Sequence, residues 1–143
     1  MNQEPLLSLP KTIWGATPAW LANPTALRFF EAEQEVMRTR FPQFQLAEST
    51  VERHQLCWTG YLRTNFGNLF LLEVVHLPSY PYSEPHVYVI TPRISGSPHS
   101  YSTGRLSVHV QWTPYRSTAV ASICSAANWL LLYENWRATG KGW

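Results

Sequence analysis

Apolar residues recur at helical spacing in a segment that begins near residue 23. Asn23 followed by Pro24 is a typical helix start, because asparagine caps the first free N–H groups and proline fits the first turn. Pro42 marks the end of the segment. The pattern predicts one apolar face, made by Leu27, Phe30, Met37 and Phe41. It places the charged side chains mostly on other faces, namely Glu31, Glu33, Glu35 and Arg38.

A second helical pattern follows Pro114. Either Ser117 or Thr118 can cap its start, and Gly140 suits its end. The predicted apolar stripe contains Val120, Ile123, Ala127, Leu130 and Leu131. Cys124 falls on the same stripe, so we expect its thiol in the core.

Between these two segments the pattern changes to short apolar runs separated by polar or glycine-containing turns, which is typical of an antiparallel meander. The four runs are residues 44–51, 54–62, 68–77 and 86–92. We therefore predict an α+β fold, with an N-terminal helix, a four-stranded antiparallel meander and a C-terminal helix. We expect one domain over residues 23–143, preceded by an irregular arm over residues 1–22.

The segment from His99 to Pro114, HSYSTGRLSVHVQWTP, contains the strictest alternation of apolar and polar residues. Leu106, Val108, Val110 and Trp112 alternate there with Arg105, Ser107, His109 and Gln111. Alternation of this kind indicates an extended, strand-like segment with one buried face. Ser107 is then held by its apolar neighbours and directed toward solvent. That position suits a nucleophile, and it equally suits an ordinary surface serine.

Composition narrows the classes of function. The chain has 143 residues, 45% of them hydrophobic, which is enough for one core without disulfides. The net charge is only +2 and the basic residues are scattered, so we expect no nucleic-acid partner. All nine acidic residues are glutamates, which excludes a Ser-His-Asp triad.

Cys57 resembles a buried core thiol. Neither the cysteines nor the five histidines have metal-ligand spacing, so we predict no metal site. With no signal peptide or membrane span in view, we expect a cytoplasmic protein.

Several motifs occur in the order found in the ubiquitin-conjugating enzyme (UBC) family. Tyr80–Pro81 resembles the Tyr-Pro turn of that family, and Pro85 resembles the proline that opens its fourth strand. His99 is similar to the histidine of its His-Pro-Asn element. Gly104–Ser107 resembles its Gly-x-Ile/Leu-Cys element, and Trp112–Pro114 its Trp-x-Pro element. The resemblance implies the UBC-like fold.

The resemblance covers roughly residues 24–137 and is closer to compact bacterial members of the superfamily, which belong to CBASS antiphage systems. Those members carry His-x-Tyr-x-x-Gly-x-Leu-Cys, matched here by HSYSTGRLS, and a tail similar to YENWRATGKGW. The resemblance implies a thioester between the catalytic residue and the C-terminal glycine of a cGAS-like nucleotidyltransferase (CD-NTase), followed by transfer to a protein amine. It implies no cofactor, because the acyl donor is a protein C-terminus.

This chain departs from the family pattern at two positions. Ser107 stands where the family has its cysteine, and Ser100 and Tyr101 follow His99 in place of Pro-Asn. The family associates that asparagine with the oxyanion region, a role that His99, Tyr101 or backbone N–H groups could take here. The resemblance places the partner's tail beside residues 99–112, in a groove that includes Arg105, His109 and Trp112.

A serine at this position changes the chemistry. A thiol ionises with a pKa of about 8.5, whereas an alcohol stays protonated and attacks poorly without a general base. Three interpretations of Ser107 follow: a replacement made to trap a complex, a naturally inactive member that acts as a binding scaffold, or a serine nucleophile helped by His109. Glu84 is either a residue that orients the acceptor amine or a solvated loop glutamate.

Two functions of other classes also fit an α+β domain of this size. The first is a non-catalytic binding module on the same fold, which recognises a partner protein without forming an adduct. The second is a small nucleic-acid-binding domain, which the low net charge and the absence of a basic stripe oppose.

Overall fold

The structure, a computed structural model, describes residues 18–94, 96–141 and 143. Its helices and strands are η1 (Ala19–Ala22), α3 (Pro24–Arg40), β1 (Gln45–Glu48), β2 (Leu56–Arg63), β3 (Leu69–Val75), β4 (His86–Thr91) and α4 (Ala119–Thr139). The strands form one sheet in the order β1-β2-β3-β4, and each is antiparallel to its neighbour. The predicted α+β fold, a meander between two long helices, is confirmed.

The helix ends follow their local sequence signals. The side chain of Asn23 accepts hydrogen bonds from two N–H groups of the first turn of α3, at 2.8 and 3.2 Å. Thr118 caps α4 in the same way through one N–H group at 3.3 Å. At the other end of α4, Gly140 adopts the left-handed conformation with φ 71°. Asn23 and Thr118 thus cap the helix starts, and Gly140 ends α4, as the sequence predicts.

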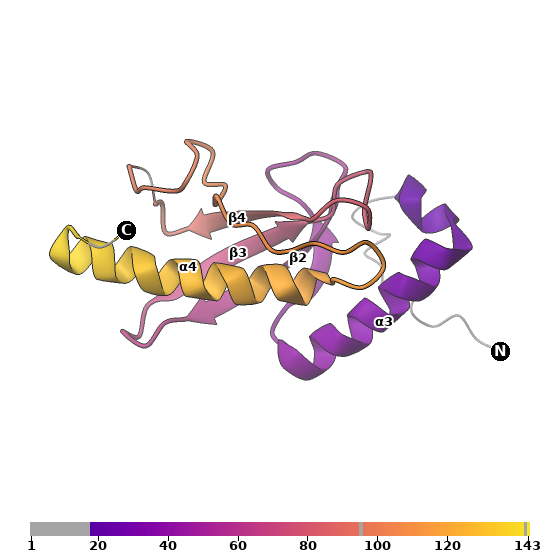
Figure 1. The fold of residues 1–143 in the computed structure, drawn as a ribbon, viewed down its shortest axis with the longest axis horizontal. Helices are drawn as coiled ribbons and strands as arrows, with labels where there is room; N and C mark the ends of the chain where they lie inside the picture. The colour runs from indigo at the N-terminus through magenta and orange to yellow at the C-terminus, as the bar shows by residue number, and fades with distance from the viewer. Residues whose placement is uncertain (1–17, 95, 142) are drawn as a thin grey trace.

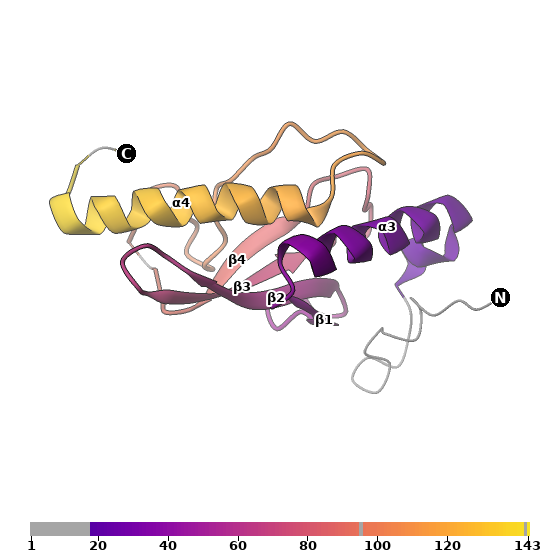
Figure 2. The same ribbon diagram turned by 90° about the horizontal axis from the view of Figure 1, so that it is seen from below.

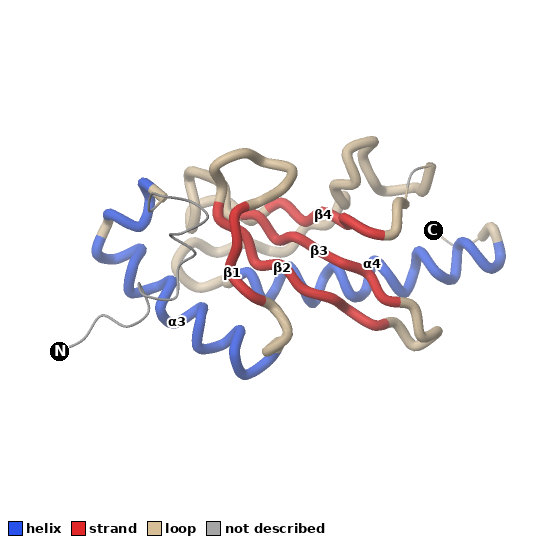
Figure 3. Tube along the Cα trace, turned by 180° about the vertical axis from the view of Figure 1, so that it is seen from behind, coloured by secondary structure: helices blue, strands red, loops and turns tan. Residues whose placement is uncertain are grey.

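The two long helices lie on the same side of the sheet. α4 extends along most of the length of the strands (Figure 1). α3 lies beside the N-terminal end of α4 (Figure 2). Figure 3 shows the sheet from its other side, which no described helix covers. The molecule is therefore a two-layer structure, with its main core between the helices and one face of the sheet.

Large apolar side chains fill that core. Among its fully buried members are Phe30, Met37, Phe70, Leu72, Ile123 and Leu130. Trp20 and Leu21 of η1 also belong to it, so the end of the predicted arm packs into the domain. The rest of that arm, residues 1–17, lies outside the described residues. Cys57 is fully buried, as predicted, on the opposite face of the sheet, and its burial raises the pKa of its thiol.

The buried face of α4 agrees only in part with the predicted stripe. Val120, Ile123 and Leu130 are buried as predicted, together with Trp129 and Tyr133, which the prediction left out. Ala127 and Leu131 are exposed, and so is Cys124, so the prediction of a core thiol at Cys124 is wrong. Because this helix is apolar on more than one side, packing against the sheet decides which side is buried. Despite these apolar sides, neither α4 nor any other helix in the described residues has the length and hydropathy needed to cross a membrane.

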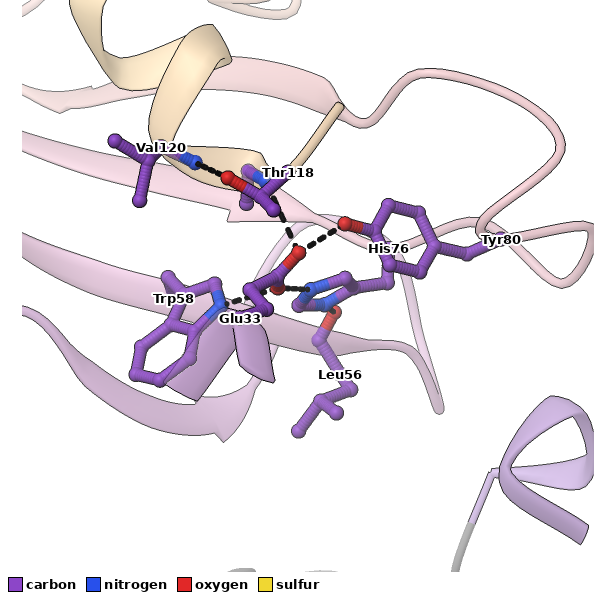
Figure 4. Close-up of polar contacts among 8 residues, drawn as sticks. Glu33, Leu56, Trp58, His76, Tyr80, Thr118 and Val120 are labelled. Carbon is purple, nitrogen blue, oxygen red and sulfur yellow. Dashed lines mark hydrogen bonds and ion pairs between the residues drawn. The ribbon is translucent and has the colours of Figure 1, made fainter. Parts of the chain in front are cut away.

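Glu33 contradicts the predicted placement of charge on α3, because its side chain is completely buried. Its carboxylate accepts hydrogen bonds from four groups (Figure 4). Oε2 accepts from Trp58 Nε1 on β2 and from His76 Nε2 just after β3, both at 2.8 Å. Oε1 accepts from the Tyr80 hydroxyl and from the N–H of Ala119, at 3.0 Å, in the first turn of α4. One carboxylate thus joins α3, the sheet, the Tyr80–Pro81 turn and α4.

His76 is the charged partner closest to Glu33 in this network when its ring is protonated. It is fully buried, and both of its ring nitrogens face acceptors: Nε2 lies 2.8 Å from the carboxylate, and Nδ1 lies 3.0 Å from the Leu56 carbonyl oxygen. A protonated ring can donate to both. Burial acts to raise the pKa of Glu33, but the hydrogen bond and the charge of His76, with further hydrogen bonds, together hold that pKa below its ordinary value.

The substitution Glu33→Gln tests this network. The amide group of glutamine turns one oxygen acceptor into a donor, which leaves buried N–H or O–H groups unpaired and leaves His76 without its counter-charge. We expect a loss of about 3–5 kcal/mol in the free energy of unfolding, measured by urea denaturation. Glu35→Gln on the same helix is the control. Glu35 is exposed and, among the described residues, its carboxylate pairs with Arg38 alone, so its loss is expected to stay below about 1 kcal/mol. Equal losses for the two variants would contradict the assigned role of Glu33.

Acid should remove the contribution of Glu33. Because its pKa in the folded state lies below the unfolded value of about 4.3, the unfolded chain binds the proton more tightly. The contribution is therefore complete above that pH and is lost as the pH falls through the folded pKa. We expect the difference in unfolding free energy between the parent chain and Glu33→Gln to shrink between pH 7 and pH values below about 4. A difference that stays constant over this range would count against the ionised network.

Candidate functional site

The segment that carries Ser107 is attached to the free edge of β4. The N–H of Val89 donates to the carbonyl oxygen of Gly104 at 2.9 Å, and the N–H of Leu106 donates to that of Val87 at 2.8 Å. These bonds have the antiparallel pattern of a sheet, although the pairing is too short to count as a fifth strand. The position of Ser107 is thus determined by the sheet directly before it.

A second attachment fixes Ser107 to α4. The chain folds back between His99 and Ser107, and the N–H of Ser107 donates to the His99 carbonyl oxygen at 2.9 Å. The same oxygen accepts a hydrogen bond from the indole N–H of Trp129 on α4, at 3.0 Å. His99 adopts the left-handed conformation, with φ 59°, at this fold-back. Its carbonyl oxygen therefore connects the segment to the helix.

Beyond Leu106 the segment leaves the sheet, so Ser107 is not part of a strand as the alternation predicts. In this alignment Leu106 lies opposite Val87, and the next pairing position would set Val108 against Pro85. Proline has no N–H to donate, so the ladder stops there. The alternation itself persists as a pattern of exposure: Val108, Val110 and Trp112 are half-buried, whereas His109 and Gln111 are exposed.

The side chain of Glu84 takes over where the ladder ends. Its Oε1 accepts the N–H of Val110 at 3.1 Å, and its Oε2 lies 3.1 Å from Nδ1 of His109. The backbone beyond Ser107 is therefore held by a carboxylate in place of a neighbouring strand.

Ser107 lines a pocket of about 300 Å³ between this segment and α4. His99 and His109 line it from the segment, and Ser125 and Asn128 line it from the helix. Within the described residues the Ser107 hydroxyl has no hydrogen-bond partner, and no three histidine, cysteine or glutamate side chains form a group that could hold a metal ion. A larger cavity, of about 460 Å³, lies between the β2–β3 turn and the end of α4 and contains none of the predicted site residues.

Aromatic rings form one end of the pocket. The Trp143 ring packs against those of His99 and Trp129, with centroids 5.2 and 4.8 Å apart, and Trp129 stacks on Tyr133 at 5.3 Å. Sequence reasoning missed both tryptophans as part of the site. The signal that could have identified them is the large number of tryptophans, which the chain places partly on α4 and after it.

Comparison with known proteins identifies the family and the fold of this chain. The family model described as "Type II CBASS E2 protein" matches residues 33–143. The chain belongs to this family. It is 33% identical over 61 residues to ubiquitin-conjugating enzyme E2 W of Caenorhabditis elegans, a match that covers 41% of this chain and 39% of the nematode enzyme. The structure of human ubiquitin-conjugating enzyme E2 G1 matches with a TM-score of 0.55 at 16% identity, covering 81% of this chain and 98% of that one, which shows the shared fold.

Membership of the type II CBASS E2 family confirms the resemblance seen in the motifs: this is an E2-like protein of a CBASS system with a UBC-like fold. Within this E2-like chain only part of the predicted site comes together. His99, Ser107 and His109 line one pocket. Arg105 and Tyr101 pack on each other instead, with the guanidinium carbon 5.1 Å from the ring centroid, and Tyr101 lines a separate cavity of about 140 Å³.

Trp112, predicted as a groove residue, lies against the turn that precedes β4. Its indole N–H donates to the Pro81 carbonyl oxygen at 2.9 Å, and its ring lies 5.7 Å from that of Tyr80. Because the Tyr80 hydroxyl is bonded to Glu33, this contact links the far end of the segment to the buried carboxylate. Trp112 thus fastens the segment and does not line the Ser107 pocket.

Gly104 offers a test of how the candidate site is positioned. It has φ 89°, and a Cβ added there would lie 2.9 Å from the carbonyl oxygen of Val89. Gly67 is the matched control, because it has φ 88° but nothing within 4 Å of an added Cβ. Both alanine variants carry the strain of a left-handed backbone, but only Gly104→Ala also pushes against β4. We expect it to lose about 1–3 kcal/mol more unfolding free energy than Gly67→Ala in urea denaturation. Equal losses would mean that the close approach to β4 does not matter.

Proposed function

We propose that this chain accepts the C-terminal acyl group of a CBASS CD-NTase at position 107 and passes it to a protein amine. The observation that supports this best is the setting of Ser107. Its backbone is bonded to the His99 carbonyl oxygen beside α4, and its side chain lines a pocket that opens to solvent. Family membership supports the CBASS context, and the HSYSTGRLS motif supports the choice of residue.

The partner's tail is proposed to enter between the segment at residues 107–109 and α4. Ser125 and Asn128 present polar groups with which an extended main chain can form hydrogen bonds. Trp129 and Trp143 form an apolar wall at one end, which suits a tail that ends in a small residue. In this proposal His109 remains in the groove, whereas Arg105 and Trp112 support the segment from outside it.

Loading means attack on an activated C-terminal carbonyl, for example a thioester carried by another molecule. The oxygen or sulfur at position 107 forms a bond to the carbonyl carbon, the bond to the activating thiol breaks, and the proton of the attacking group leaves to solvent. Serine makes this step slow, because an alcohol is not ionised near neutral pH. It also makes the product long-lived, because an oxyester reacts with amines less readily than a thioester. The serine form is therefore proposed to hold the acyl group or the bound tail.

A non-catalytic scaffold is the second candidate function. The observation that favours it is that no described residue bonds to the Ser107 hydroxyl, so no base is in place to activate it. In that case the chain binds the tail in the same pocket and forms no adduct.

The test uses Ser107→Cys in a Cys124→Ser background, because Cys124 is an exposed thiol that would otherwise react, whereas Cys57 is buried. The donor is a peptide of the CD-NTase tail prepared as a small-molecule thioester. We expect intact mass spectrometry to show one acyl adduct, removed by hydroxylamine, that forms at least about 100-fold faster than on Ser107.

Ser125→Cys in the same background is the matched control, since it places a thiol in the same pocket from α4. It is expected to load much more slowly than Ser107→Cys. Similar loading of the two variants would argue against position 107. Tail binding to Ser107→Cys without any adduct would support the scaffold instead.

A further inference from the structure

Glu84 and His109 are arranged as an oriented base at the edge of the Ser107 pocket. Nδ1 of His109 lies 3.1 Å from Oε2 of Glu84, while Oε1 of the same carboxylate accepts the N–H of Val110 at 3.1 Å. Both oxygens are thus in use, so the carboxylate cannot rotate without breaking one of these bonds. His109 itself lines the pocket together with Ser107.

We infer that His109, oriented by Glu84, is the general base that takes the proton from the acceptor amine at position 107. This inference rests on the proposed function and assigns it a proton acceptor. Glu84 acts as a positioning residue, because it contacts the imidazole and not the reacting atoms.

The carboxylate determines which ring nitrogen is available. An ionised carboxylate only accepts hydrogen bonds, so Nδ1 of His109 carries the ring proton and Nε2 keeps its lone pair. The His109 side chain is 67% exposed, whereas that of Glu84 is only 28% exposed. The orienting group is therefore sheltered, while the imidazole is free to reach the pocket and to exchange its proton with solvent.

The local fold gives the Glu84 carboxylate a second role as a backbone acceptor. Pro85 ends the pairing with β4, so the backbone N–H of Val110 has no strand carbonyl to bind. The residue just before that proline, Glu84, supplies the acceptor. The same carboxylate that completes the backbone hydrogen bonding thereby also orients His109.

The chemistry balances without any further reagent. The amine nitrogen attacks the carbonyl carbon of the acyl group on residue 107 and forms a C–N bond. Nε2 of His109 takes the proton that the nitrogen must lose. The bond between carbonyl carbon and sulfur, or oxygen in the serine form, then breaks. The imidazolium returns the proton to that leaving atom, so the products are an amide and the free side chain.

The other groups facing this pocket do not share the arrangement. The α4 side chains that line it, among them Ser125, Asn128 and Trp129, have no charge. His99 is the second titratable side chain of the pocket, and its ring packs on Trp143. Within the described residues no carboxylate is bonded to the His99 ring, so His109 is the histidine with a defined orientation.

The experiment separates loading from discharge. The Ser107→Cys, Cys124→Ser chain is loaded with the tail thioester, excess donor is removed, and free lysine is added as the amine. Loss of the adduct is followed by mass spectrometry at several pH values, with rates expressed per unprotonated lysine. His109→Gln and Glu84→Gln are introduced into the same background. His54→Gln is the control, because His54 is a similarly exposed histidine whose Nδ1 is 3.7 Å from the Glu48 carboxylate, outside the pocket.

We expect His109→Gln to slow discharge about 100-fold and to abolish the fall in rate that acid causes in the parent. Glu84→Gln keeps the bond to Val110 through its amide oxygen but presents an NH₂ group to His109. Nδ1 must then accept, and the proton moves to Nε2, where it blocks the base. We expect discharge to slow at least about 10-fold in this variant. Because His109 also lines the groove, loading is measured in each variant; discharge should fall by more than loading does, whereas His54→Gln should match the parent in both steps.

Each result has one meaning. A parent chain that does not load overturns the proposed function, and the inference falls with it. Discharge that falls no more than loading does in His109→Gln overturns the inference alone. Slow discharge in His109→Gln with parental discharge in Glu84→Gln overturns the role of Glu84.

Discussion

The Glu33 carboxylate is the constraint on which the packing of this domain depends. A charge buried away from water is stable only where enough donors surround it, and here they come from β2, the residue after β3, the Tyr80–Pro81 turn and the first turn of α4. Apolar contacts tolerate small sliding movements between a helix and a sheet. Four hydrogen bonds to one carboxylate do not, because each has a required distance and direction. The helices are thereby held in one position over the sheet.

The candidate site inherits its geometry from this network through both of its walls. On the segment side, the Tyr80 hydroxyl is bonded to Glu33, the Tyr80–Pro81 turn holds Trp112, and Trp112 closes the segment that begins at Ser107. On the helix side, Glu33 accepts the N–H of Ala119, which sets the start of α4 and hence the course of the helix that carries Trp129. The candidate site is thus joined to the buried network through hydrogen bonds, although Glu33 itself does not line the pocket.

Local signals explain what the sequence could predict. Asn23, Thr118 and Gly140 act within one helical turn, and the strands follow from short apolar runs, so the elements and their order were predictable. The order of motifs also predicted the family correctly, whereas the assignment of Ser107 to the position of the family's cysteine stays a prediction. The burial of Glu33 could not be predicted, because its donors lie 25 to 86 residues away in the chain. The buried face of α4 was equally uncertain, since that helix is apolar on several sides. Pro85 was visible in the sequence, but its effect on Val108 depends on a pairing register that only the folded sheet defines.

The carbonyl oxygen of His99 belongs to both walls of the pocket at once. It accepts from the backbone of Ser107 on one wall of the pocket and from the indole of Trp129 on the other. The two walls thus share one acceptor atom, and separating them would stretch a bond to it. For the tail proposed above, this shared atom would limit how far the pocket can widen. A small residue next to the reacting carbonyl would then fit the opening better than a branched one.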